Sequence, residues 1–239
     1  MRVILSLSII FFLACCKQRP ARVTNLSLDG IVISDTAVVP DSFLTWREHS
    51  GYPIYYLGPI LDTIRIGRQY IKGNTPWAND YWQVRSRRYS DNTLQIVVDT
   101  SSETDSPEEY LQENYQVLED STNHYKSFLF YVRNISDSAI HLGGMFSLQF
   151  MHREVKDRQG NWIKIERKLS EYSFCTTGAP IVLLCPQDIV ISKLRRYSGS
   201  FVTDFRLVLG DGDQAVYSNV FRDSIDPAVF EEEIIGDLQ

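Results

Sequence analysis

Short segments in which apolar and polar residues alternate recur along most of this chain. Valine, isoleucine, tyrosine, phenylalanine and threonine dominate these segments, while Gly, Asn, Asp and Pro separate them. Alternation with a period of two places one set of side chains on a buried sheet face and the other set in solvent, so the pattern is typical of β-strands. Many short strands with regular turn signals predict a mainly β fold, built as an antiparallel sandwich.

The second half of the chain shows this pattern most clearly. Phe128, Phe130 and Val132 share one side of a segment, and Phe146, Leu148 and Phe150 share one side of another. The glycines of Gly210-Asp211-Gly212-Asp213 supply the positive φ that tight hairpins need. We predict strands at Tyr125–Arg133, Phe146–Val155, Trp162–Arg167, Ile189–Leu194, Phe201–Leu209 and Ala215–Phe221, with hairpin loops at Lys156–Asn161 and Gly210–Asp213.

The first half has strand signals at Tyr52–Leu57, Thr63–Ile71, Tyr81–Tyr89 and Thr93–Asp99, followed by a polar, acidic stretch. That stretch, Asp99–Glu109, is typical of a linker or exposed loop. Ser106 is a suitable N-cap, so a short helix is predicted over Pro107–Leu118. The first half is either a smaller β module or a set of extra strands on the same sheets. The expected division is 1–14 signal peptide, 15–24 tether, 25–105 N-terminal β module, 106–230 β-sandwich and 231–239 acidic tail.

The N-terminus combines a basic residue with a short apolar run. Arg2 precedes a run from Val3 to Ala14, which is too short to span a bilayer and ends at two cysteines. Leu13-Ala14-Cys15 resembles the lipobox of bacterial lipoproteins, although Phe12 stands where that motif prefers Leu. The resemblance implies that the Cys15 thiol carries acyl chains that hold the protein at a membrane. Acylation of Cys16 and an ordinary cleaved signal are the alternatives.

A second resemblance concerns Phe128–Phe221. Its motifs Gly160-Asn161-Trp162, Gly199-Ser200-Phe201 and Tyr217-Ser218-Asn219 are similar to those of uncharacterised immunoglobulin-like domains in envelope lipoproteins of the Bacteroidota. The resemblance implies an immunoglobulin-like sandwich and no particular reaction. Surface-exported members carry an acidic run after the cysteine, whereas Lys17 and Arg19 follow it in this chain. We therefore expect an outer-membrane lipoprotein that faces the periplasm.

Composition and motifs exclude several functions. The net charge is −6 without a basic stripe, which argues against nucleic-acid binding. The Gly-x-Ser-x-Gly, phosphate-loop and His-Glu-x-x-His patterns are all missing, so no cofactor and no metal are expected. The aspartates of Gly210–Asp213 lack the order of an EF-hand, and turn chemistry accounts for them without calcium.

Two candidate sites remain. Cys175 and Cys185 lie close enough in sequence to form a disulfide in an oxidising compartment, and the alternative is a pair of small buried side chains. The other is an aromatic and basic patch, whose members suit stacking on sugar rings and binding of carboxylates or hydroxyls. The alternative for the patch is a core strand whose arginine side chains face solvent. Its expected ligand-binding residues are Trp77, Tyr81, Trp82 and Arg85.

The sequence thus favours a lipid-anchored, non-catalytic envelope protein that binds a protein or glycan partner. The alternative is a carbohydrate-active hydrolase whose two carboxylates are not recognisable from spacing. A third hypothesis is a proteinase-inhibitor-like sandwich that presents the Cys175–Cys185 loop.

Overall fold

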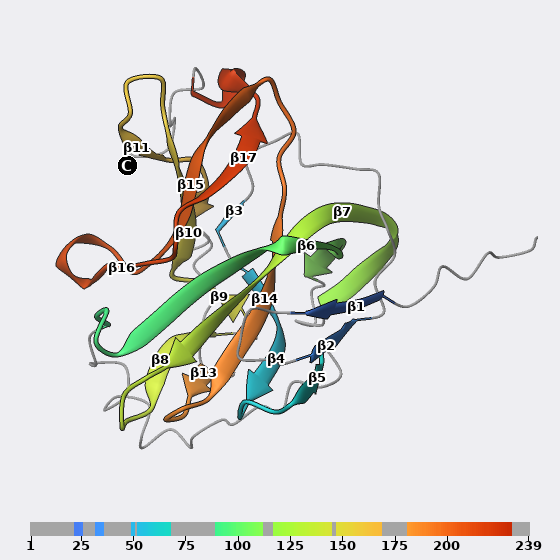
Figure 1. Cartoon of the computed structure of the whole chain (residues 1–239), viewed down its shortest axis with the longest axis vertical. Helices are drawn as coiled ribbons and strands as arrows, with labels where there is room; N and C mark the ends of the chain where they lie inside the picture. Colours follow the sequence, from blue (N-terminus) through green and yellow to red (C-terminus); the bar gives the residue numbers. More distant parts are fainter. Residues whose placement is uncertain are drawn as a thin grey trace, which may run out of the picture.

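The computed structural model describes residues 22–25, 32–35, 49–50, 52–67, 89–111, 117–144, 147–168 and 181–230. These residues form a mainly β protein whose sheets are predominantly antiparallel (Figure 1). The only helical elements among them are two 3-10 turns, η3 (Gly212–Gln214) and η4 (Pro227–Phe230). The predicted fold class, mainly β with antiparallel sheets, is confirmed. The immunoglobulin-like strand order stays a prediction.

The largest sheet has seven strands and is antiparallel throughout. Its centre is β14, which pairs with β4 on one side and with β7 on the other. The hairpin of β6 and β7 closes one end of the sheet. The strand order is β13 (Ile181–Leu184), β8 (Ile140–Gly144), β9 (Ser147–Leu148), β4 (Tyr52–Gly58), β14 (Ile189–Arg195), β7 (Val117–Asn134) and β6 (Leu94–Leu111).

A second sheet has five strands around β15. β10 pairs with one edge of β15, while β16 and β17 share its other edge. The strands are β11 (Trp162–Lys164), β10 (Met151–Lys156), β15 (Phe201–Leu209), β16 (Val216–Tyr217) and β17 (Phe221–Ile225). Two smaller sheets consist of β1 (Arg22–Asn25), β2 (Val32–Asp35) and β5 (Thr63–Arg65), and of β3 (His49–Ser50) with β12 (Arg167–Lys168).

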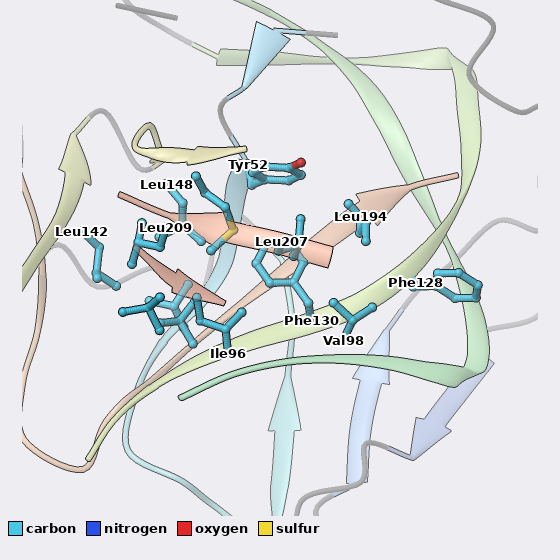
Figure 2. Packing of buried hydrophobic residues seen from close by; sticks show 14 of the residues in the cluster. Tyr52, Ile96, Val98, Phe128, Phe130, Leu142, Leu148, Leu194, Leu207 and Leu209 are labelled. Atoms are coloured by element: carbon cyan, nitrogen blue, oxygen red, sulfur yellow. The ribbon is translucent and has the colours of Figure 1, made fainter. Parts of the chain in front are cut away.

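The main core lies between the seven-stranded and the five-stranded sheet. Figure 2 shows Phe130 and Val98 of the first sheet beside Leu207 of the second. The opposite side of the seven-stranded sheet is buried too, because Leu129 and Tyr131 pack with Ile33 of β2 and its neighbours in a second cluster. Residues 128–132 are therefore a continuous apolar run, as expected for a strand covered on both faces.

The predicted helix over Pro107–Leu118 is wrong, and so is the exposed loop at Asp99–Glu109. β6 continues through this stretch to Leu111, and β7 begins at Val117. Ser106, the expected N-cap, is instead 2% exposed, and its hydroxyl accepts a hydrogen bond from Arg195. Lys193 and Arg196, at the distant β14, form ion pairs with Asp105 and Glu103, and these tertiary contacts outweigh local turn propensity.

Strands from both expected modules share one sheet. β4 lies entirely within residues 25–105 and pairs with β14. β6 begins within those residues and pairs with β7. The predicted division between residues 105 and 106 runs through β6, and β1 begins within the predicted tether. Described strands of the first half thus pair with strands of the second half in one sheet. The predicted signal peptide and the acidic tail lie outside the described residues.

Candidate binding surface

Most of the site residues predicted from sequence lie outside the described part of the chain. This applies to the acylation site Cys15, to Cys175, and to the aromatic patch of Trp77, Tyr81, Trp82 and Arg85. Cys185 is half-buried and follows the last residue of β13. The acylation, the disulfide and the patch therefore stay predictions.

The five-stranded sheet presents a different surface, on the side away from the core. Along β15, Phe205 and Leu207 point into the core, so the alternate residues Asp204 and Arg206 point outward. The same alternation applies to β10, where Met151 and Val155 are the core residues. We call this surface the open face. The open face includes His152, Glu154, Lys156, Trp162, Asp204, Arg206, Tyr217 and Arg222.

Arg206 organises the centre of the open face. Its guanidinium carbon lies 4.2 Å from the ring centroid of Trp162 and 4.0 Å from that of Tyr217. Its Nε donates to Glu154 Oε2 at 2.7 Å, and its Nη2 lies 2.6 Å from the same oxygen in an ion pair. Cation–π contacts and a charge-assisted hydrogen bond fix both aromatic rings and one carboxylate around a single cation.

A second group of charges lies beside Trp162. Lys156 Nζ donates to Asp204 Oδ2 at 3.0 Å, and Arg222 Nη1 donates to Asp204 Oδ1 at 3.3 Å. Lys156 Nζ also lies 5.2 Å from the Trp162 ring centroid. Two cations thus share one carboxylate, and the Arg222 side chain is 67% exposed.

The electrostatics of the open face make stability depend on pH. His152, with its Nε2 3.7 Å from Oε1, and the donating Arg206 together lower the pKa of the Glu154 carboxyl below its ordinary value of 4.5. A carboxyl whose pKa is lower in the folded state stabilises the fold above its unfolded-state pKa, and this stabilisation is lost as pH falls.

We therefore expect wild type to be more stable than Glu154→Gln at neutral pH and the difference to shrink below pH 4.5. The measurement is the urea-unfolding free energy of both proteins across the acidic range. Both proteins contain the other acids, such as Asp157, whose pKa is also lowered, so the contributions of these acids to the pH dependence cancel in the comparison. A difference that stays constant with pH would contradict this assignment.

Two carboxylates converge elsewhere, near the end of β14. Arg196 forms an ion pair with Glu103 and a forked one with Asp223, whose Oδ1 lies 2.6 Å from Nη2. The guanidinium also lies over the Phe128 ring, at 4.6 Å from its centroid. Because one guanidinium binds both acids, this arrangement holds β6 and β17 together rather than presenting a pair of free carboxylates.

A third charged group explains how acids of the misassigned loop are accommodated. Asp105 is 4% exposed, and its Oδ2 lies 2.5 Å from His124 Nδ1. Its Oδ1 lies 3.8 Å from Nζ of the buried Lys193, which in turn lies over the Tyr55 ring. Buried charges need such partners, and these contacts fix the β6–β7 hairpin to β14.

Sequence reasoning missed the open face, although part of its signal is visible. The alternation of Asp204 and Arg206 with Phe205 and Leu207 already identifies an outward side. The register is what the sequence lacks: Glu154 pairs with Arg206, and Lys156 pairs with Trp162. Only these pairings bring the aromatic and basic side chains together.

In the described part of the chain, no group of three or more His, Cys, Asp or Glu residues is arranged to hold a metal ion. Nor do the described residues include a helix long and apolar enough to cross a membrane. Comparisons with protein-family models, with curated proteins and with solved structures find no match. The fold and the open face therefore define only a class, a mainly antiparallel β protein with an exposed aromatic and charged sheet face.

Proposed function

We propose that this chain is a lipid-anchored, non-catalytic protein of the cell envelope that binds a protein or glycan partner through the open face. The anchor is the acylated Cys15 inferred from Leu13-Ala14-Cys15, and the outer membrane with the periplasmic side is the expected location. An immunoglobulin-like sandwich is the finer fold class that we propose for it.

The observation that carries the binding function is the arrangement around Arg206. Aromatic and charged side chains on a protein surface are normally mobile, and ordering them when a partner binds costs free energy. Trp162 and Tyr217 are instead held by Arg206, which is itself held by Glu154. Tyr217 nevertheless remains 43% exposed. A preorganised, exposed aromatic surface is suited to recognition, because Trp, Tyr and Arg dominate the binding energy of interfaces.

The same contacts disfavour the hydrolase alternative. A glycosidase needs two carboxyl groups with different protonation states on either side of the scissile bond. On the open face, Glu154 is bound by Arg206, and Asp204 is bound by Lys156 and Arg222. His152 and Arg206 lower the pKa of the Glu154 carboxyl, which is the wrong direction for a general acid. Binding is therefore the function that the geometry supports best.

Site-specific photocrosslinking in living cells tests this proposal. A benzophenone amino acid is placed at Tyr217 on the open face or at Leu61 in the β4–β5 connection, which are 43% and 48% exposed. Because the two positions are similarly exposed, both probes have similar access to proteins that are not specific partners. We expect a discrete adduct in the envelope fraction from position 217, in several-fold excess over position 61. Equal yields from the two positions, or no adduct from position 217, would count against a partner at the open face.

A further inference from the structure

We propose that the ligand of the open face is an acidic polysaccharide. Its carboxylate or sulfate groups bind beside Lys156 and Arg222, and its sugar rings lie against Trp162. This inference rests on the proposed function, and it specifies the chemistry of the partner.

The balance of charge points to an anionic ligand. The charge of Arg206 is matched by Glu154, which accepts a hydrogen bond from Nε and forms an ion pair with Nη2. The group around Asp204 is unbalanced, because Lys156 and Arg222 share that one carboxylate. Arg222 is the more exposed of the two, at 67% of its side chain, and a guanidinium has five N–H donors. One unmatched positive charge at this place, in a chain of net charge −6, is complementary to an anion.

The shape of the charged row indicates an extended ligand. Trp162, Lys156, Asp204 and Arg222 come from β11, β10, β15 and β17, which are consecutive neighbours in the sheet. With strands about 4.8 Å apart, the row spans about 14 Å across the sheet. Trp162 provides an apolar ring at one end, and the exposed cation Arg222 stands at the other. A polymer with alternating apolar and anionic faces contacts both ends at once.

The position of the row favours a polysaccharide over an acidic peptide. Extended peptides commonly bind to sheets by adding a strand at an edge, where backbone N–H and C=O groups are free. The row instead crosses β10 and β15, and each of these strands pairs with neighbours on both sides. Only side chains are offered to a ligand there, which suits sugar hydroxyls, carboxylates and ring faces.

The test uses the full-length acylated protein in detergent, with polygalacturonate as the probe and its methyl ester as the uncharged matched polymer. We expect the Kd for polygalacturonate to rise about tenfold in Arg222→Gln and in Lys156→Gln, as loss of one charge-assisted contact predicts. Arg158→Gln is the matched control, because it removes the same charge from the exposed tip of the β10–β11 hairpin. This variant should stay within about twofold of wild type. The methyl ester should bind at least tenfold more weakly than the acid.

Three results would overturn the inference. The first is a rise in Kd in Arg158→Gln equal to that in Arg222→Gln and Lys156→Gln, which would show that binding depends only on net charge. The second is equally tight, Arg222-dependent binding of poly-glutamate, which would make the ligand an acidic protein. The third is failure of both polygalacturonate and dextran sulfate to bind while position 217 still crosslinks in cells. In that third case the partner-binding function stands and only its chemistry is wrong, whereas loss of the crosslink itself counts against the function.

Discussion

Glu166→Gln should destabilise the protein by about 3–5 kcal/mol, the usual loss when one partner of a buried ion pair is removed. Arg153 and Glu166 lie in the core between the sheets, 2% and 5% exposed, with Arg153 Nε 3.1 Å from Glu166 Oε1. That contact is close but not aligned as a hydrogen bond. The guanidinium is otherwise held by the Arg195 carbonyl, at 2.8 Å, and by the ring of Tyr197.

Glu166 also accepts hydrogen bonds that a glutamine preserves. The Tyr52 hydroxyl donates to Glu166 Oε2 at 2.6 Å, and the Arg153 backbone N–H donates to the same oxygen at 2.8 Å. Burial, followed by the charge of Glu166, raises the pKa of the Tyr52 hydroxyl well above its ordinary value, so this phenol remains a donor. The amide oxygen of the introduced glutamine can still accept both bonds. The substitution therefore isolates the charge and leaves Arg153 buried without its counter-ion.

The control is the double variant Arg153→Met/Glu166→Gln, which removes both charges and keeps the apolar stem of residue 153. We expect the double variant to be at least about 2 kcal/mol more stable than the sum of the two single losses predicts. Urea-unfolding free energies of the four proteins give this coupling directly. Additive losses, or a loss below about 1 kcal/mol for Glu166→Gln, would show that the pair is not coupled in the core.

Gly199→Ala should destabilise the protein by about 3 kcal/mol or more, at the upper end of the range for overpacking. A Cβ at this position would lie 2.0 Å from the carbonyl carbon of Ile225 and 2.1 Å from the nitrogen of Asp226. Both are backbone atoms, so no rotamer change relieves the contact. Gly199 also lies between β14 and β15, where the chain passes from the seven-stranded to the five-stranded sheet.

Gly160→Ala is the matched control for Gly199→Ala. Gly160 has φ of +85° in the β10–β11 hairpin, and a Cβ there meets nothing within 4 Å. Only the left-handed backbone conformation is unfavourable for alanine, which amounts to about 1–2 kcal/mol. Urea unfolding of the two variants should therefore show the larger loss at residue 199. The packing argument fails if Gly160→Ala is the less stable protein.

The strands that were predicted well are those whose local pattern agrees with their final environment. Phe201–Leu209 is predicted and observed with the same bounds, because its alternating residues face one core and one open surface. The β6–β7 hairpin was missed over Asp99–Leu118 because its acids and its proline indicate a loop locally. Arg196 and Lys193, about 90 residues away, neutralise Glu103 and Asp105. No local pattern contains that information.

The motifs that suggested a family resemblance have structural roles in this fold. The side-chain amide of Asn219 donates to the Val98 carbonyl and accepts from the Val98 N–H, so it closes part of the outer edge of β6. Asn161 donates its backbone N–H to Asp157 in the β10–β11 hairpin. Gly199 allows two backbone segments to approach each other. Such positions indicate how the chain folds, which is why they suggested an architecture and gave no reaction.

The candidate binding residues also differ in how far the sequence alone identifies them. Aromatic and basic residues that lie close together in sequence can be recognised from the sequence alone, as in the predicted patch of Trp77, Tyr81, Trp82 and Arg85. Trp162, Arg206 and Tyr217 are spread over more than 50 residues of sequence, and cross-strand register alone assembles them. A binding surface of this kind depends on pairing, so its members become recognisable only when the strand order is known.

The proposal on which the search for a partner depends most is the anchor, because it decides in which compartment the open face is presented. The most direct test is the intact mass of the membrane-extracted protein, compared between wild type and Cys15→Ala. We predict a wild-type mature chain that begins at Cys15 and carries acyl groups, and loss of that acylated form in the variant. An unacylated mature chain in wild type, or acylation that persists in Cys15→Ala, would contradict the anchor at this residue.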